Sequence, residues 1–172
     1  MTNVILVDVN DNPVGKAEKM QAHKEGLLHR AFSVFIFNSQ GKMLLQQRAQ
    51  HKYHSGGLWT NACCSHPEPG EETDAAALRR LHEEMGFTVP VTKLFSFVYK
   101  ASFDNGLTEY EFDHVFAGKY DGVIDFNKQE VMDYCYKSMD EVESALFLHP
   151  DQYTAWFHIA FPKVKEWWKG QQ

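Results

Sequence analysis

Three clusters of residues carry side chains that can transfer protons or bind a metal ion. They are His23 with His29, the run Cys64-Ser65-His66, and the pair Glu109 and Glu111. The two glutamates lie two residues apart in a stretch typical of a β-strand, so both carboxylates project from one face and repel each other unless a cation or proton lies between them. The neighbouring Phe112, Val115 and Phe116 favour burial, which makes an unpaired carboxylate costly. The pair therefore indicates either a metal site or the solvated face of a half-exposed strand.

The histidines and cysteines have more than one interpretation when each is taken alone. Neutral imidazole is a common ligand of transition metals, but a single histidine is more often a surface or capping residue. The six-residue spacing of His23 and His29 matches no compact metal motif, so the fold must assemble any joint site. Cys64 lies in a setting where a positive neighbour or a metal lowers a thiol pKa, although it also fits a small buried side chain. Cys63 and Cys135 fit buried side chains better.

Four basic residues are scattered along the chain: Lys19, Arg48, Lys52 and Arg80. Charged side chains of this kind usually cover a solvated face, and together they can also bind a phosphate group. Arg80 is four residues before Glu84 in a predicted helix, a spacing that favours a structural ion pair.

The composition excludes several classes of protein. The chain has 172 residues, of which 44% are apolar and 23% charged, a balance typical of one globular domain. Seventeen Lys and Arg against 23 Asp and Glu give a net charge of −6, which argues against a nucleic-acid or membrane partner. No apolar run approaches about 18 residues and no signal-peptide pattern opens the chain, so we expect a cytoplasmic protein. Three cysteines, two of them adjacent, do not indicate a disulfide scaffold.

Hydrophobic periodicity predicts the elements that must position these residues. Strands are expected at 4–9, at 31–37 and 43–48 as a β-hairpin, and at about 93–103 and 107–117 around the turn Asp104-Asn105-Gly106. Apolar residues from Ala75 to Met85 recur at helical spacing, and Gly86 is placed to end that helix. Further helices are expected at about 139–147 and 151–168, with Pro162 placed to kink the second. This order indicates a single mixed α/β domain.

Residues 65–87 resemble the Nudix box, which runs Gly, five residues, Glu, seven residues, then Arg-Glu-apolar-x-Glu-Glu-x-Gly-apolar. The matching positions here are Ser65, Glu71, Arg79, Arg80, Leu81, Glu83, Glu84, Gly86 and Phe87. Ser65 replaces the first glycine, and Arg80 replaces a glutamate that hydrolysing members use around their magnesium ions. The resemblance implies an α/β (α+β) fold, a Nudix-like mixed β-sheet sandwiched between helices, as a single domain over 1–172. The Arg80 departure argues against diphosphate hydrolysis.

A second resemblance covers nearly the whole chain. The segments LLHRAFSVFIFN at 27–38, WTNACCSHP at 59–67 and TEYE at 108–111 are similar to the signatures of type I isopentenyl-diphosphate delta-isomerases, a non-hydrolysing Nudix branch. This resemblance implies a flavin-independent, metal-dependent isomerase of isoprenoid biosynthesis. Such an enzyme interconverts isopentenyl diphosphate and dimethylallyl diphosphate by protonation and deprotonation through a carbocation-like species.

The resemblance also implies a role for each matching residue. Cys64 and Glu111 are the expected catalytic thiol and carboxylate, and Tyr99 and Trp156 are expected to line the isoprenyl pocket and assist catalysis. The expected metal ligands are His23, His29, His66, Glu109 and Glu111, with Glu84 at a second ion on the diphosphate. The diphosphate itself is expected to bind Lys19, Arg48, Lys52 and Arg80. Ala155 departs from the family's Thr-Pro-Trp motif and leaves Trp156 less constrained.

The same resemblance implies cofactors and a partner. We expect Mg²⁺ at the substrate diphosphate, and Mn²⁺, Mg²⁺ or Zn²⁺ at the site of three histidines and two glutamates. The expected partner is a small-molecule isoprenyl diphosphate, and the chain is expected to be a monomer or a weak homodimer. Residues 1–30 are expected to cover part of the active site. The alternatives are a Nudix hydrolase of a nucleoside diphosphate derivative and a binding module without catalysis.

Overall fold

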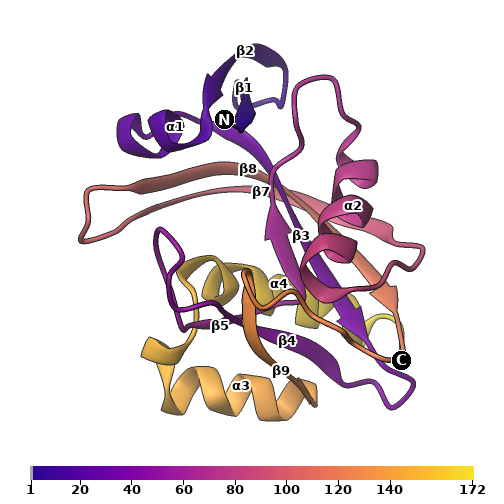
Figure 1. Cartoon of the computed structure of the whole chain (residues 1–172). Helices are drawn as coiled ribbons and strands as arrows, with labels where there is room; N and C mark the ends of the chain where they lie inside the picture. Colours follow the sequence, from indigo (N-terminus) through magenta and orange to yellow (C-terminus); the bar gives the residue numbers. More distant parts are fainter. Residues whose placement is uncertain (1) are drawn as a thin grey trace.

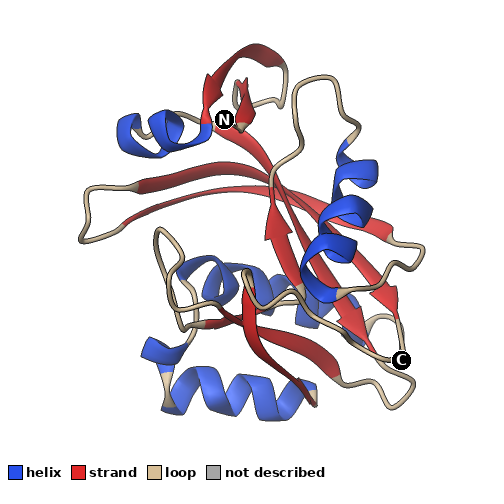
Figure 2. Cartoon of the chain, viewed as in Figure 1, coloured by secondary structure: helices blue, strands red, loops and turns tan. Residues whose placement is uncertain are grey.

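The computed structural model describes residues 2–172, within which nine β-strands and four α-helices are arranged in layers (Figures 1 and 2). The strands are β1 (Asn3–Val7), β2 (Pro13–Glu18), β3 (His29–Phe37), β4 (Met43–Arg48), β5 (Trp59–Thr60), β6 (Cys63–Ser65), β7 (Thr92–Ser102), β8 (Thr108–Lys119) and β9 (Val131–Lys137). The helices are α1 (Lys19–Glu25), α2 (Thr73–Met85), α3 (Met139–Leu148) and α4 (Ala155–Lys169), with one 3₁₀ turn at Pro150–Gln152.

Strand β3 is the centre of the fold and pairs along both of its edges. It runs parallel to β8 over its whole length, from His29 opposite Glu111 to Phe37 opposite Lys119, and antiparallel to β6. Strand β7 extends the sheet beyond β8, and β1 with β2 joins near His29. Strand β4 leaves β3 after the single pair Phe37 and Met43, and it forms a second layer with β5 and β9 (Figure 1).

Alternate side chains of β3 enter two hydrophobic cores. Phe32, Val34 and Ile36 pack against the buried face of α2. Phe35 and Phe37 point to the other side and pack against α3 and α4. Each fully buried side chain of this size stabilises the fold by about 1.5–3 kcal/mol. Helices therefore cover both faces of the sheet, as the sequence predicts.

The helix ends follow from the local sequence. Gly86 ends α2 with a φ of 80° and donates its N–H to His82, an arrangement that favours glycine. A Cβ at Gly86 would lie 2.2 Å from the carbonyl oxygen of Asp125, so a larger residue does not fit. Ser138 and Glu141 form a capping box that begins α3.

Three features differ from the sequence expectation. Strands β3 and β4 do not form an extended hairpin, because β8 and β6 occupy the hydrogen-bonding edges of β3. Helix α1 has only seven residues and shows no helical periodicity in the sequence. Strand β9 mixes polar and apolar residues and gives no clean alternation. By contrast, helix α4 continues past Pro162 to Lys169, close to the expected end at 168.

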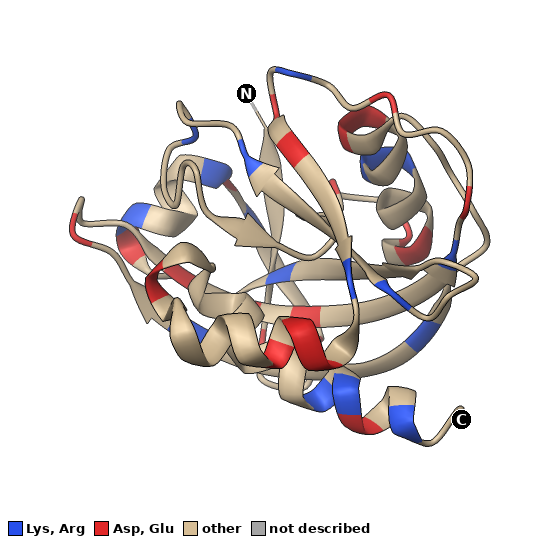
Figure 3. Cartoon of the chain, turned by 90° about the horizontal axis from the view of Figure 1, so that it is seen from below, with Lys and Arg blue, Asp and Glu red and all other residues tan. Residues whose placement is uncertain are grey.

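The charged residues are spread over several elements. Figure 3 shows Lys and Arg interspersed with Asp and Glu along the ribbon. One ion pair, between Glu143 and Lys165, links α3 to α4. Within residues 2–172, no helix has the length and apolar character needed to span a membrane.

Candidate active site

Two glutamates of β8 and the first residue of β3 lie together because these strands are parallel and in register. Glu109 and Glu111 share one face of β8, and His29 lies directly opposite Glu111. The His29 Nε2 atom is 3.2 Å from Oε2 of Glu111. Glu109 and Glu111 are only 3% and 6% exposed, so the interpretation as a solvated strand face is wrong.

Two further histidines reach the same carboxylates from other elements. Glu18 caps α1 and Gly26 ends it in the left-handed conformation, and this short helix places His23 with its Nε2 3.2 Å from Oε1 of Glu109. His66 directly follows β6, and its Nε2 lies 2.6 Å from Oε2 of Glu111. The fold thus assembles the joint site that sequence spacing alone does not show.

These five residues offer ligand atoms that all lie within 4.8 Å of one another: His23, His29, His66, Glu109 and Glu111. The backbone oxygens of Lys19 and Leu27 accept a hydrogen bond from Nδ1 of His23 and His29, at 2.6 and 2.8 Å. Each Nε2 faces a carboxylate, so it either carries a second proton or offers its lone pair to a cation that the same carboxylate also binds. The Oε2 atom of Glu109 is buried without a partner in this structure. This donor set fits a divalent metal ion.

Burial and neighbouring charges act in opposite directions on these groups. Burial favours a raised pKa for Glu111, but the imidazoles of His66 and His29 outweigh it and hold this pKa well below its usual range. Burial lowers the pKa of His66 to about 4 against the attraction of Glu111. Burial and the charge of Glu111 raise the pKa of Asp113 well above its ordinary value. Glu111 is therefore a carboxylate at neutral pH, whereas burial favours the protonated form of Asp113.

Cys64 lies on β6 with its thiol toward the same site, whereas Cys63 points into the α2 core. The thiol donates to Oδ1 of Asn61 at 3.0 Å, and Nε1 of Trp156 donates to the sulfur at 3.1 Å. Burial, followed by the nearby Asp113, raises the pKa of Cys64 to about 12. The site therefore holds a protonated thiol and not a thiolate.

One small cavity connects the thiol and the carboxylates. It has a volume of about 20 Å³ and is lined by Arg48, Tyr53, His54, Cys64, Ser65, His66, Tyr99, Glu109, Glu111 and Trp156. The hydroxyl of Tyr99 donates to Glu111, and the guanidinium of Arg48 lies 5.2 Å from the ring centre of Trp156. This volume holds about one water molecule. A larger ligand therefore enters only when side chains of the wall move.

The basic residues lie in three positions around this cavity. Arg48 lines it directly, whereas Lys52 and Arg80 both approach Glu130, at 2.5 and 3.5 Å. Lys19 lies over the ring of Tyr53, 4.2 Å from its centre. Burial and the charge of Lys52 lower the pKa of Lys19 to about 8.

Comparisons with known proteins identify the family to which this arrangement belongs. The NUDIX domain family matches residues 27–157. An isopentenyl-diphosphate Delta-isomerase of Pectobacterium atrosepticum is 52% identical and the match covers 99% of this chain and 95% of that protein. One of Burkholderia multivorans is 48% identical over 94% of this chain and 92% of that protein. The chain belongs to the isopentenyl-diphosphate Delta-isomerases.

Solved structures agree with this assignment at the level of the fold. A crystal structure from Deinococcus radiodurans has a TM-score of 0.71 at 18% identity, and the match covers 86% of this chain and 90% of that one. A MutT NUDIX hydrolase from Burkholderia pseudomallei has a TM-score of 0.63 at 18% identity, with 80% and 98% covered. The isomerase family and the Nudix fold expected from the motifs are thereby confirmed, and the hydrolase alternative is not supported.

The structure brings the expected catalytic residues and most of the expected metal ligands together, and Glu84 lies apart from them. The five expected metal ligands form one group, and Cys64, Tyr99 and Trp156 lie on the cavity beside them. Glu84 lies outside that group and contacts Gln46, Cys63 and Arg80 at 3.3, 3.1 and 3.3 Å. Trp156, which follows Ala155, is 3% exposed and lines the cavity.

Tyr53 and His54, which line the cavity, and Asp113, which lies beside Cys64 through Ser33, are absent from the sequence prediction. Asp113 continues the face of Glu109 and Glu111 by two more residues, so extending the same alternation identifies it. His54 contacts Glu109 from a glycine-containing loop, and no spacing rule connects the two. The polar richness of that loop is the one signal that marks it as part of a site.

Proposed function

We propose that this chain interconverts isopentenyl diphosphate and dimethylallyl diphosphate by moving a double bond by one carbon. The reaction requires one proton delivered to the alkene and another removed two carbons away. The observation that carries the proposal is that Cys64, a protonated thiol, and Glu111, a carboxylate, line one buried cavity. The names of the relatives support the same substrate. Because the reaction is reversible, the donor in one direction is the acceptor in the other.

The group of five ligands positions Glu111 in this proposal. A divalent ion bound there would fix both carboxylates and lower the proton affinity of Glu111. The side chains of His29 and His66 orient Oε2 of Glu111, while Tyr99 donates to the same carboxylate and can carry a proton between it and the substrate. Manganese, magnesium and zinc all suit this donor set.

In this proposal the basic residues release their carboxylate partners and bind the diphosphate instead. Lys52 and Arg80 contact Glu130, and Arg80 also contacts Glu84, so an incoming diphosphate replaces these carboxylates. Both oxygens of Glu84 have partners, so Glu84 fits a Mg²⁺ ion on the diphosphate only after Arg80 moves to the substrate. Lys19 and Arg48 add positive charge beside the cavity.

Trp156 stabilises the cationic intermediate and helps to keep water out. A tertiary carbocation over an indole face gains about 0.5–2 kcal/mol in a desolvated pocket. The N–H edge of the Trp156 ring donates to the sulfur of Cys64, which places the indole beside the proton-transfer group. The small cavity of about 20 Å³, which holds about one water molecule, supports this exclusion of water.

Isomerisation in deuterated water tests the proposal. The purified protein with isopentenyl diphosphate and Mg²⁺ should form dimethylallyl diphosphate that carries solvent deuterium, without release of phosphate. Cys64→Ala and Glu111→Gln should both lose this activity. Phosphate release that survives Cys64→Ala would instead identify a hydrolase, and substrate binding without turnover would identify a binding module.

A further inference from the structure

His54 is a buried residue of the active site that the mechanism above does not use. It lies in the loop at 49–58, which connects β4 to β5. Arg48 and Leu58 pair at the base of this loop, where the backbone N–H of Arg48 donates to Leu58 at 2.9 Å. Ser55 has a φ of 55°, and this turn directs His54 inward, so that it is 5% exposed whereas His51 of the same loop is exposed.

The contacts of His54 assign a role to each of its ring nitrogens. Nε2 lies 2.5 Å from Oε1 of Glu109, and Nδ1 lies 3.1 Å from the hydroxyl of Ser55. Because the carboxylate only accepts, Nε2 carries the proton, and the serine hydroxyl donates to Nδ1. The imidazole stacks on Phe103 at 4.5 Å between ring centres and 9° between planes, and its edge meets Trp156.

The hydrogen bond from His54 to Glu109 affects which oxygen of Glu109 can bind a metal ion. His23 also approaches Oε1 of Glu109, at 3.2 Å, but its Nδ1 donates to the backbone of Lys19, which leaves its Nε2 lone pair for a cation. With a cation bound, His54 is the N–H donor that continues to hold Oε1. The other oxygen of Glu109, Oε2, is buried without a partner and is the atom left for the cation. His54 itself lies outside the five-ligand group.

We propose that His54 is a positioning residue of this isomerase, which holds Oε1 of Glu109 and thereby directs Oε2 toward the metal ion. Its ring also forms the wall of the cavity between Phe103 and Trp156. Outer residues that orient a metal ligand in this way typically contribute a factor of about 10–100 to metal affinity or activity. The catalytic part rests on the proposed function, whereas the metal-binding part does not.

Three variants of one loop separate the hydrogen bond from the stack. His54→Phe keeps an aromatic ring against Phe103 but removes the N–H donor, and His54→Gln keeps a donor but removes the ring. His51→Ala, in the same loop, is the matched control. Each metal-free protein is titrated with Mn²⁺ by calorimetry, and kcat and KM are measured by deuterium incorporation. Circular dichroism and thermal unfolding of the metal-free proteins report on folding.

The hydrogen-bond role predicts different results for the two His54 variants. His54→Phe should weaken Mn²⁺ binding about tenfold and lower kcat by a similar factor, with KM changed far less. His54→Gln should restore most of the Mn²⁺ affinity, and His51→Ala should match the wild type. If His54→Phe does not fold, Ser55→Gly suits the positive φ, removes the hydroxyl that fixes the ring, and should itself weaken Mn²⁺ binding.

Two results would overturn the proposal. Mn²⁺ affinity of His54→Phe equal to that of the wild type would show that Glu109 is positioned without His54. Equal losses in His54→Phe and His54→Gln, together with a lowered melting temperature, would show that His54 only fills space. A wild-type protein that binds Mn²⁺ but does not isomerise would contradict the proposed function instead, and the calorimetry would still decide the role of His54.

Discussion

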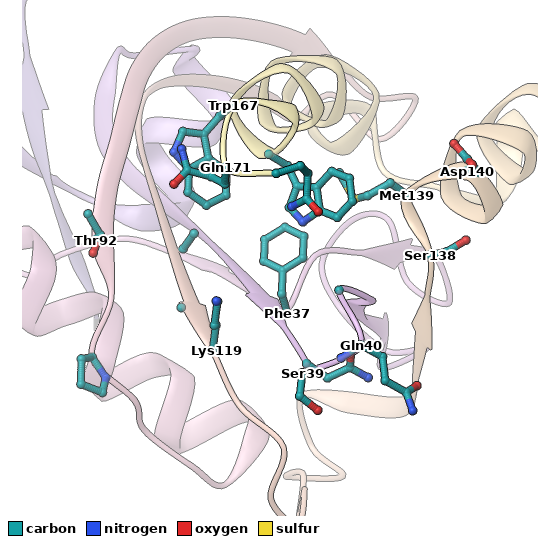
Figure 4. Close-up of a pocket in the computed structure, with 17 residues that line it drawn as sticks. Phe37, Ser39, Gln40, Thr92, Lys119, Ser138, Met139, Asp140, Trp167 and Gln171 are labelled. Carbon is teal, nitrogen blue, oxygen red and sulfur yellow. The ribbon is translucent and has the colours of Figure 1, made fainter.

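A small cavity lies at one end of the β3–β8 pair and a large open groove at the other, and only the small cavity has the features of a functional site. At one end His29 lies opposite Glu111, beside a cavity of about 20 Å³. At the other end Phe37 lies opposite Lys119, beside an open groove of about 1020 Å³ (Figure 4). The larger hollow is bordered by Trp167 and by the turn at 38–41, which Figure 4 shows around Phe37.

The difference lies in buried charge, not in volume. In the small cavity two carboxylates are almost fully buried beside three imidazoles, and a buried charge that loses its partner costs several kcal/mol. In the large groove the charged residues, Lys119 and Asp140, are exposed and cost little. Buried charged side chains that stabilise one another therefore indicate the active site of this fold better than the volume of a cavity does.

The same amide substitution at each end gives the largest expected contrast. Glu111→Gln should lower kcat by about a thousandfold or more, because it removes a proton-transfer group and a metal ligand. Asp140→Asn, at the border of the groove, should leave kcat unchanged. Deuterium incorporation into dimethylallyl diphosphate measures both variants. A Glu111→Gln enzyme with nearly wild-type kcat would remove the reason for placing the chemistry at the small cavity.

Removal of the metal should destabilise the protein through the small-cavity end of the β3–β8 pair. Without a cation, Glu109 and Glu111 repel each other, so chelation should lower the melting temperature and Mn²⁺ should restore it. At a hundredfold excess over its Kd, the ion stabilises the folded state by about 2.7 kcal/mol. Because His23 lies in α1, chelation should also speed proteolysis within residues 1–30, whereas cleavage near the C-terminus should not change. Equal cleavage of residues 1–30 with and without Mn²⁺ and a substrate analogue would contradict closure of this segment.

The charge of Lys19 should set the decrease of kcat/KM at high pH, because this side chain binds the diphosphate in the proposed function. Because burial and Lys52 lower the pKa of Lys19 to about 8, this side chain is cationic below that pH and loses its charge as the pH rises through it. We therefore expect kcat/KM for isopentenyl diphosphate to fall above about pH 8. Lys19→Arg keeps its charge and should extend activity to higher pH, whereas Lys24→Arg, at an exposed position of α1, should not. The same alkaline limb in Lys19→Arg would assign it to another group.

The two ends of β3 also differ in how far the sequence predicts them. The nearly continuous apolar run at 31–37 predicts a strand buried on both faces, because burial alone specifies that pattern. The expected ligands at the other end depend on family motifs, since His29 and Glu111 are 82 residues apart and meet only through the β3–β8 register. No local rule predicts such a long-range contact.

What the sequence could not predict depends on short or irregular segments. Helix α1 places His23 through a capping contact of Glu18 and the left-handed Gly26, and seven residues are too few to show periodicity. His54 reaches Glu109 because of the backbone turn at Ser55, where a positive φ is unusual for serine. Such turns depend on the surrounding packing, so no local sequence pattern predicts them.

Two tryptophans of α4 give the smallest and sharpest test, because one helix of about 22 Å carries them to the two ends. Trp156 donates to the sulfur of Cys64, and Trp168 lines the open groove. Trp156→Phe keeps an aromatic face but loses the N–H donor and part of the cation–π attraction, so kcat should fall by about tenfold. Trp168→Phe should change kcat by less than about twofold, since a partly exposed ring far from the site affects mainly stability. Deuterium incorporation by both variants decides the comparison. A Trp168→Phe loss as large as that of Trp156→Phe would mean that the groove is coupled to the active site through α4.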